Sequence, residues 1–393
     1  MTETVLTEAI SATPLANSLA EIAPKQGLAV PLFSYLGAFT PSHFAYNKLD
    51  APVAEIGPEI DSETRFLLSG AAMHDLGWLR RVAVRGEDRF RWLSGMVTNV
   101  VEILPDHAGT YNLVLNAQGR IQGDAYVWRE GENLELELIA EQSAALLAHF
   151  DHFIIMDDVE LAPLPDQFAL GLTGPQAEEI LAKLGLPPLP EMLTSTAGIV
   201  RTAAGDIPAR LTRAYGTLVP HYAIWVQIGQ IPILWEALIA AGATPVGALA
   251  LETLRVIEGI PGYGVDIQSR DLAHETSQTR ALNFTKGCYL GQEIVERIRS
   301  RGQVHRHLRR LELTQQDSAT IPQIGSELRV AGSSADSKAA GTLTSITSVQ
   351  LDGVRRIFAI GMIRAEAEVG NRALTYPEGT ARILNSPPKL TLA

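Results

Sequence analysis

The stretch KGCYLGQE, residues 286–293, contains the only cysteine of this 393-residue chain, Cys288. Lys286 precedes the cysteine by two residues, and Gly287 and Gly291 are typical of a loop. From about Gly291 the pattern predicts a helix, so the cysteine lies just before a helix start. Unpaired backbone N–H groups at a helix start and a nearby lysine both favour the thiolate form. Cys288 is therefore a candidate functional thiol, although a lone cysteine is more often a small buried apolar side chain.

Positive charge is concentrated downstream of this cysteine. The whole chain carries a net charge of −12, from 32 Lys and Arg against 44 Asp and Glu. Residues 286–310 hold seven basic and two acidic side chains, a net charge of +5 for the segment. Such a segment attracts polyanions. Direct binding of nucleic acid is not expected, because it usually requires a broader basic face with more aromatic residues than Tyr289 alone. A solvated charged run is the simpler alternative.

Upstream of this segment, strand-like and helical patterns alternate. Residues 78–86 have the alternation of a strand, and residues 110–140 that of an antiparallel meander. Residues 87–97 and 141–154 have helical spacing. Hairpin-connected strands followed by helices predict an α+β fold, not a doubly wound parallel sheet.

The second half of the chain continues in the same way and then changes. Residues 222–229 predict a strand, and residues 232–242 and 247–259 predict helices that each stop at a glycine. After Arg310, short β-like runs are separated by Gly and Ser, which predicts a small C-terminal barrel or sandwich. The length of the chain predicts two or three domains.

Composition narrows the protein class. A single cysteine excludes an internal disulfide and a cysteine-rich metal site. No metal site is predicted, because His149 and His152 are better explained as a solvated helix end. Glu3 and Glu8 lie where a signal peptide would be basic, and no apolar run is long enough to span a membrane. These features predict a cytoplasmic protein.

The motif and its surroundings resemble a known family. KGCYLGQE, together with LRVIEGIPGYGVD (254–266) and RIRSRGQVHRHLRRLEL (297–313), is similar to the YgfZ family of folate-binding proteins. That family is related to T-protein, the aminomethyltransferase of the glycine cleavage system. Residues 73–99 and LNAQGRIQGD (115–124) also resemble the folate domain of T-protein.

The resemblance implies an α+β fold of three domains around a central folate-sized opening, with a C-terminal β-barrel. Residues 1–60 would form an N-terminal arm and part of the first α+β domain. Residues 61–160 would form the α+β folate-binding domain, residues 161–303 a second α+β domain with the KGCYLGQE motif, and residues 304–393 the barrel.

The resemblance also implies roles for individual residues. Cys288 and Lys286 would be the catalytic pair. The contacts to folate would come from Asn116, Asp124, Arg255, Glu258, Tyr289 and Gln292.

Asp124 is the remaining member of an aspartate pair, because Gly123 replaces the first. The resemblance implies that its carboxylate would steady positive charge on the folate nitrogens. A solvated hairpin aspartate is an equally simple alternative.

Arg255 lies in the run Leu-Arg-Val-Ile-Glu-Gly (254–259), between Glu252 and Glu258. Its planar fork of donors would suit the edge of a pterin, or it would belong to an exposed row of ion pairs of little energetic value. T-proteins also bind the pterin through a glutamate that lies just before a strand. The matching residues 214–226 contain no acidic residue, so that contact does not carry over.

The function implied by the resemblance is a tetrahydrofolate-binding accessory protein for iron–sulfur cluster assembly or repair. Its ligand would be tetrahydrofolate or a folate derivative, and the basic segment would attract a polyglutamate tail. Its partners would be iron–sulfur client or assembly proteins, including cluster-dependent tRNA-modifying enzymes. The alternatives are a tetrahydrofolate-dependent aminomethyltransferase and an interaction module without a small ligand. Whether the protein catalyses a reaction stays open.

Overall fold

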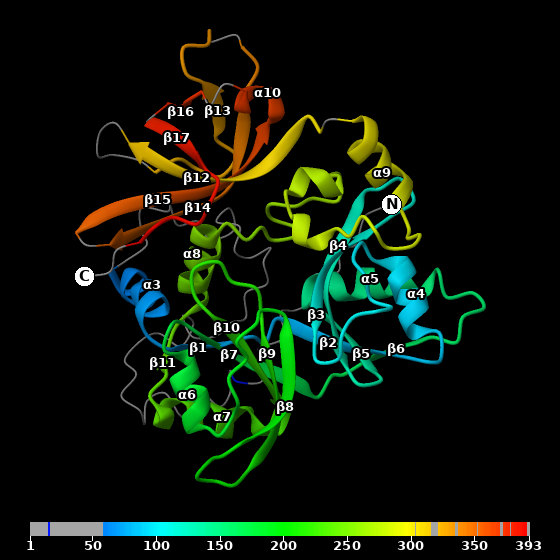
Figure 1. Ribbon diagram of the computed structural model, residues 1–393. Coiled ribbons are helices and arrows are strands. Elements are labelled where there is room, and N and C mark those ends of the chain that lie inside the picture. The colour runs from blue at the N-terminus through cyan, green and yellow to red at the C-terminus, as the bar shows by residue number, and fades with distance from the viewer. Residues whose placement is uncertain are drawn as a thin grey trace, which may run out of the picture.

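The structure is a computed structural model that describes Leu15 and residues 58–302, 304–315, 321–334, 337–351, 353–369, 372–377 and 379–390. Most of the arm expected over residues 1–60 therefore lies outside the described residues. Two β-sheets and a closed barrel form the molecule, with helix α8 (Ala248–Glu258) between the barrel and the six-stranded sheet (Figure 1).

The first sheet is antiparallel and has the strand order β3-β4-β5-β2-β6. Apolar side chains alternate along its strands and face two helices, where Trp92 and Phe150 contact each other edge to face. The elements are β2 (Leu79–Arg85), α4 (Arg89–Met96), β3 (Gly109–Leu115), β4 (Ile121–Glu130), β5 (Asn133–Ile139), α5 (Ala140–Asp151) and β6 (Glu160–Pro163).

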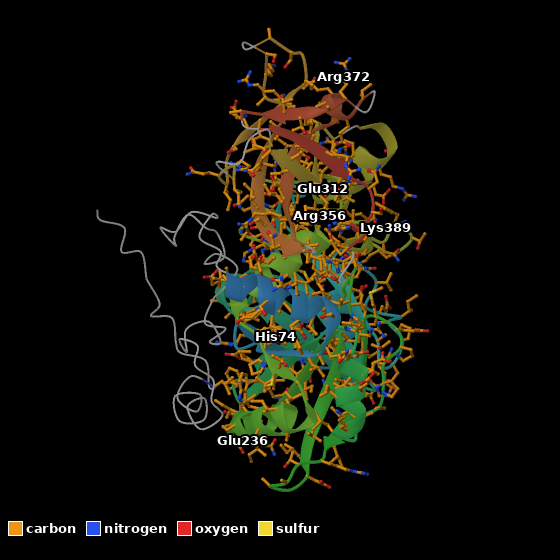
Figure 2. The ribbon with its side chains drawn as sticks, turned by 90° about the vertical axis from the view of Figure 1, so that its left-hand side faces the viewer. His74, Glu236, Glu312, Arg356, Arg372 and Lys389 are labelled. Carbon is orange, nitrogen blue, oxygen red and sulfur yellow. The ribbon has the colours of Figure 1, made fainter. Side chains whose placement is uncertain are left out.

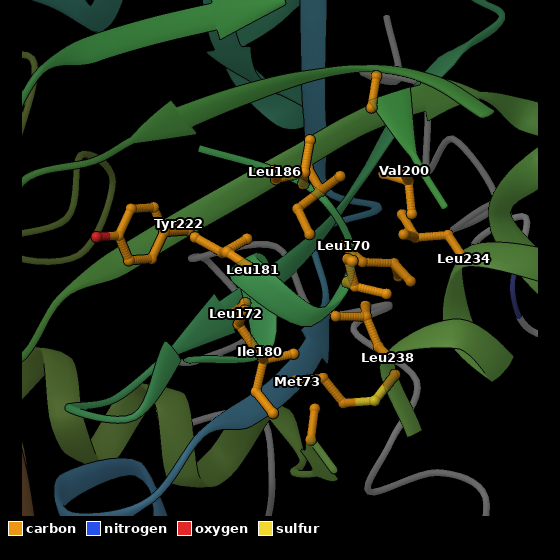
Figure 3. Packing of buried hydrophobic residues seen from close by; sticks show 14 of the residues in the cluster. Met73, Leu170, Leu172, Ile180, Leu181, Leu186, Val200, Tyr222, Leu234 and Leu238 are labelled. Atoms are coloured by element: carbon orange, nitrogen blue, oxygen red, sulfur yellow. The ribbon is translucent and has the colours of Figure 1, made fainter. Parts of the chain in front are cut away.

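The second sheet has six strands in the order β11-β1-β7-β10-β9-β8, of which only β1 and β11 pair in parallel. Its core packs Met73, Leu172, Leu181 and Leu238 between the sheet and two helices (Figure 3). The elements are β1 (Ala72–Asp75), β7 (Gln167–Thr173), α6 (Ala177–Lys183), β8 (Thr194–Val200), β9 (Ile207–Arg213), β10 (His221–Gln227), η4 (Ile228–Gln230), α7 (Ile231–Ala241) and β11 (Thr244–Pro245).

The C-terminal barrel closes in the order β12-β15-β14-β13-β16-β17. Closure leaves no open sheet edge. The ion pairs of Glu312 with Arg356 and Arg382 link three strands of the barrel, and Figure 2 labels Glu312 and Arg356. The elements are β12 (Arg306–Gln315), β13 (Glu327–Val330), β14 (Gly341–Leu351), β15 (Val354–Arg364), α10 (Ala365–Glu368), β16 (Leu374–Tyr376) and β17 (Gly379–Leu384).

Helix α8 and helix α3 (Pro58–Ser69) join these parts through one apolar cluster. Leu67 of α3, Leu113 of β3, Leu254 of α8 and Phe358 of β15 all belong to it, and each is at most 1% exposed. Helix α8 ends at Gly259, whose φ of 66° is the left-handed conformation that favours glycine. The remaining elements are η5 (Ala273–Thr276), η6 (Thr279–Ala281) and α9 (Gln292–Arg301).

A buried ion-pair network holds the two sheets together. Glu135 of β5 lies 3.0 Å from Arg81 of β2 and 2.8 Å from Arg210 of β9. Arg81 is 1% exposed and also pairs with Glu137 at 2.9 Å. Because these charges are buried and paired across two sheets, they fix the relative position of the sheets that enclose the site described below.

The predicted α+β class and C-terminal barrel are confirmed, as are the two helices predicted to stop at glycines. The proposed domain limits stay predictions. Strand β1 lies within residues 61–160 but pairs in the second sheet, so at this point the chain crosses between the two sheets. Among the helices of the described residues, none is long and apolar enough to cross a membrane.

Candidate functional site

A central cavity of about 270 Å³ lies where the two sheets meet α8. Its walls come from β3 and β4 of the first sheet, from β1 and β10 of the second, and from α8 with the segment that follows it. Aromatic and aliphatic side chains form most of the lining, with a few charged groups among them. A largely apolar hollow with a few convergent polar groups is the usual form of a small-molecule site.

Asp124 of β4 is the carboxylate of the first-sheet wall. Its Oδ2 accepts a hydrogen bond from Tyr111 Oη at 2.7 Å, and its Oδ1 accepts one from Gln142 Nε2 at 2.8 Å. Burial raises the pKa of Asp124 above its usual value, against the lowering effects of these two donors. A solvated hairpin aspartate is therefore excluded, since the side chain is held inside the protein at the cavity wall.

Gly123 has a packing reason to be glycine. A Cβ at this position would lie 2.6 Å from Gln142 Oε1 and 2.8 Å from both methyl carbons of Leu146. A second aspartate here would therefore displace Gln142, which also bonds the backbone N–H and C=O of Asp124.

The cavity also has an aromatic wall beside Asp124. Tyr111 and Tyr126 contact each other with ring centroids 5.1 Å apart. The guanidinium carbon of Arg280 lies 4.1 Å from the ring centroid of Tyr111 and 3.9 Å from that of Tyr215. Tyr111 thus contacts both the Arg280 guanidinium, through its ring, and the Asp124 carboxylate, through its hydroxyl group.

Glu258 is fully buried at the C-terminal end of α8 and reaches the loop before β10. Its Oε1 accepts the backbone N–H groups of Thr217 at 2.9 Å and Leu218 at 2.8 Å, and its Oε2 lies 3.0 Å from His221 Nε2. Burial alone would raise its pKa, but His221 and these two N–H groups hold it below the usual value. Glu258 thus supplies a carboxylate to the loop whose own sequence contains none.

His74 of β1 forms another part of the wall. Burial, followed by the proximity of His221, lowers the pKa of His74 to about 3, so His74 is neutral at physiological pH. Its Nε2 lies 3.0 Å from Thr173 Oγ1, which lies 3.5 Å from His221 Nδ1.

Arg255 lines the cavity, but protein groups already occupy all its donors. Its Nε and Nη2 donate to Glu252, its Nη1 donates to Asp266 and to the Ile260 carbonyl, and its Nη2 also donates to Ser345. An arginine has five N–H donors, and these five hydrogen bonds use them all. Arg255 is therefore a buried link between α8 and the barrel in this structure, neither an exposed ion-pair row nor a free fork for a pterin.

The KGCYLGQE loop packs beside the first sheet, and none of its residues lines the cavity. Lys286 Nζ donates to three backbone carbonyls at the end of α4, those of Ser94 at 2.5 Å, Val97 at 2.6 Å and Asn99 at 2.7 Å. Burial lowers the pKa of Lys286 to about 7. The geometry makes Lys286 the group that fixes the loop to α4.

Replacing Lys286 by methionine is expected to lower the free energy of unfolding by about 1.5–3 kcal/mol, because three backbone carbonyl groups lose their hydrogen-bond donor. Chemical denaturation measures this change. Lys183→Met is the matched control, since its Nζ is exposed and donates only to the Ala241 carbonyl. Equal losses in the two variants would contradict the anchoring role of Lys286.

The remaining motif residues divide into exposed and buried groups. Cys288 is exposed. Tyr289 is 7% exposed and packs in the apolar cluster of α3 and α8. Gln292 Oε1 accepts the Tyr289 N–H at 3.3 Å, so both side chains shape the loop and neither reaches the cavity.

Asn116 builds the turn on which this loop rests. Its Oδ1 accepts the N–H groups of Gln118 and Arg120 at 3.0 and 2.9 Å. A Cβ on Gly291 would lie 2.6 Å from the Asn116 carbonyl oxygen, and Gly291 has a φ of 82°. The glycine is therefore required both by its conformation and by this close approach.

The basic segment is less open than its net charge of +5 predicts. Arg306 pairs with Asp271 and Glu275, and Arg309 pairs with Glu368. Lys286 is held by carbonyls, as described above. Carboxylates from other parts of the chain thus neutralise two of the seven cations, whereas Arg297 and Arg299 of α9 are exposed. Attraction of a polyglutamate tail stays a prediction.

Comparison with known proteins places these features in a family. Residues 29–286, more than half of the chain, match the model of the GCVT N-terminal domain. The chain belongs to the GCVT N-terminal domain family. The match ends at Lys286, so Cys288 and the rest of the motif lie just beyond it.

Members of the GCVT family and a related solved structure are similar over most of the chain. A putative chloroplastic transferase of Arabidopsis thaliana is 25% identical over 327 residues, which cover 82% of this chain and 72% of that protein. The aminomethyltransferase of Rubrobacter xylanophilus is 28% identical over 255 residues, 64% of this chain and 68% of that protein. Aminomethyltransferase T of the glycine cleavage system from Bartonella henselae has the same fold, with a TM-score of 0.71 at 20% identity over 84% of this chain and 89% of that one. The predicted relation to T-protein is confirmed, and the narrower YgfZ assignment stays a prediction.

Several cavity residues of this GCVT family member have no motif in the sequence. Tyr126 could have been found, because it follows Asp124 by two residues on one strand and therefore shares its face. Arg280 and His221 carry no local signal, since only the tertiary fold brings them to Tyr111 and Glu258.

Proposed function

We propose that this protein binds tetrahydrofolate or a folate derivative in the central cavity and presents Cys288 to an iron–sulfur assembly or client protein. The observation that carries the folate part is the position of Asp124, a buried carboxylate at the wall of an aromatic cavity. Such a carboxylate stabilises positive charge on a ligand nitrogen more strongly than it would in water. The tyrosines beside it supply flat apolar surface for a ring system.

The size of the cavity fits part of a folate molecule. Its volume of about 270 Å³ is slightly below the range of pockets that enclose a whole drug-sized ligand. The bicyclic head of the folate would therefore bind inside, and the glutamate tail would extend out of the cavity.

The position of Cys288 supports a partner-directed thiol. The side chain is exposed and belongs to a loop that does not line the cavity. A thiol in this position meets a second macromolecule more readily than it meets a ligand bound at Asp124. The iron–sulfur role and its cluster-dependent tRNA-modifying clients rest on the resemblance of the motif.

A folate-dependent aminomethyltransferase is the second candidate, and one observation favours it. Glu258 places a buried carboxylate against the loop before β10, near where a T-protein uses a glutamate from that loop. Incubation with tetrahydrofolate and an aminomethyl donor separates the two candidates. Turnover that depends on Asp124 and not on Cys288 would favour the transferase.

Calorimetry with tetrahydrofolate tests the folate part, with saturable binding as the expected result. Absence of binding at about 1 mM tetrahydrofolate would contradict the folate part of the proposal. Cys288→Ala tests the thiol part. It is expected to fold and to bind tetrahydrofolate like the wild type, yet to leave cluster-dependent enzyme activity unrestored in cells that lack the protein. Full restoration by Cys288→Ala would remove the thiol from the proposal.

A further inference from the structure

Arg280 is an internal arginine at the cavity whose guanidinium has neither a carboxylate nor a backbone carbonyl as partner among the described residues. Among the described residues it forms no ion pair, although its side chain is partly buried at the cavity. Five other internal arginines of the described chain lie within 3.0 Å of a carboxylate oxygen: Arg81, Arg255, Arg306, Arg309 and Arg356. Arg80, Arg129 and Arg310 form no ion pair among the described residues, but their guanidinium groups donate to backbone carbonyls. The guanidinium of Arg280 has neither kind of partner in the described chain. Burial of an unpaired cation is unfavourable, so its position calls for a counter-charge.

Neutral groups hold Arg280 in place and leave one side of its guanidinium free. Its Nε donates to Gln278 Oε1 at 3.1 Å, and its Nη1 donates to Tyr126 Oη at 3.2 Å. Its Nη2 has no partner among the described residues. The rings of Tyr111 and Tyr215 contact the guanidinium carbon at 4.1 and 3.9 Å, which supports the cation without neutralising it. Donors on both terminal nitrogens are therefore available to one incoming group.

Asp124 does not serve as the missing counter-ion. Its two oxygens accept from Tyr111 and Gln142, and it forms no ion pair with Arg280. Tyr111 contacts both residues, so a fixed cation and a fixed carboxylate lie at neighbouring points of one cavity.

We propose that Arg280 binds a carboxylate of the ligand that enters this cavity. A guanidinium with donors free on both terminal nitrogens matches the two oxygens of a carboxylate, and the hydrogen bonds are charge-assisted. The inference rests on the proposed folate function and adds a second, anionic subsite beside Asp124.

The carboxylate has two chemical sources. It belongs to the folate itself if the glutamate end reaches Arg280, or to a separate small acid if the bicyclic head is held at Asp124. In the second case a small carboxylic acid binds at Arg280 beside the bicyclic head, and glycine is its probe.

Paired probes that differ in a carboxylate test the proposal by calorimetry. The first pair is tetrahydrofolate and tetrahydropterin, which lacks the glutamate tail. The second pair is glycine and glycinamide, each titrated with and without tetrahydropterin. The proteins are the full-length wild type, Arg280→Gln, Arg280→Lys and, as a matched control, Arg201→Gln, whose arginine is exposed outside the cavity.

In at least one pair, the probe with a carboxylate is expected to bind the wild type at least about tenfold more tightly than the probe without one. The control variant Arg201→Gln should show the same preference. Arg280→Gln should reduce that preference to less than about twofold and leave the affinity of the carboxylate-free probe unchanged. Arg280→Lys keeps the positive charge but lacks the paired N–H donors of the guanidinium, so it should retain part of the preference. It also provides a test if Arg280→Gln does not fold. A preference in the first pair identifies the folate glutamate as the source, and one in the second pair identifies a separate acid.

Two results overturn the inference: no preference in the wild type for either pair, or a preference that persists in Arg280→Gln. The proposed function fails separately. If neither folate probe binds while glycine is preferred over glycinamide, the anionic subsite stands without a folate site. If the folate probes bind and neither pair shows a preference, the folate site stands without the anionic subsite.

Discussion

Replacing Glu258 by alanine is expected to lower the free energy of unfolding by about 3–5 kcal/mol, the usual loss when one partner of a buried charged network is removed. Glu258 is fully buried in the folded protein. Its removal leaves the N–H groups of Thr217 and Leu218 without their acceptor and His221 without its carboxylate. Urea denaturation of wild type and variant measures the difference.

The pH dependence of this loss tests its cause. The pKa of Glu258 lies below its usual value in the folded protein. Its contribution to stability is therefore fully present above the pKa that it has in the unfolded chain, and is lost as the pH falls through the lower folded value. The difference between wild type and Glu258→Ala should accordingly shrink in strongly acidic solution.

Glu236→Ala is the matched control, because Glu236, labelled in Figure 2, is an exposed glutamate on α7 that does not line the cavity. It is expected to leave stability unchanged. A loss at Glu258 no greater than that at Glu236, or one independent of pH, would show that the network around His221 contributes little.

Local patterns predict the elements of this fold well, because each depends on neighbouring residues. Gly242 and Gly259 end α7 and α8 in the left-handed conformation, as glycines after apolar helical runs do. The Gly- and Ser-separated strands of the C-terminal region close into the barrel.

Charge partners were not predictable in the same way, because they come from distant parts of the chain. Arg255 has Glu252 in its own helix, but Asp266 and Ser345 complete its donor set from other elements. Arg306 belongs to a locally basic segment, yet Asp271 and Glu275 neutralise it. A count of charges along the sequence therefore overstates the free charge of a segment whose partners the fold supplies.

The two functional regions share one hairpin. Asp124 lies on β4, and the turn between β3 and β4 carries Asn116 and Gly119. A Cβ on Gly119 would lie 2.7 Å from Ile294 of α9, and Gly291 approaches the Asn116 carbonyl as closely. The loop that carries Cys288 and the strand that carries Asp124 are thus packed against the same turn, although the thiol does not line the cavity.

Replacing Asp124 by asparagine is expected to weaken tetrahydrofolate binding by about 30- to 1000-fold, which corresponds to about 2–4 kcal/mol. Asparagine has nearly the same shape and can still bond Gln142 and Tyr111, but it removes the negative charge at the cavity wall. Calorimetry measures the affinity. Tyr111→Phe is the control, because it removes one hydrogen bond to the carboxylate and keeps its charge, so a loss of about tenfold or less is expected.

The stability of Asp124→Asn separates a binding role from a structural one. Burial raises the pKa of Asp124, so its ionised form costs folding free energy, and that cost grows as the pH rises from the usual value through the raised one. The asparagine variant should therefore be at least as stable as the wild type near neutral pH while binding folate poorly. A variant that loses stability and affinity together would make Asp124 a structural residue, and one that binds tetrahydrofolate like the wild type would move the folate site away from this carboxylate.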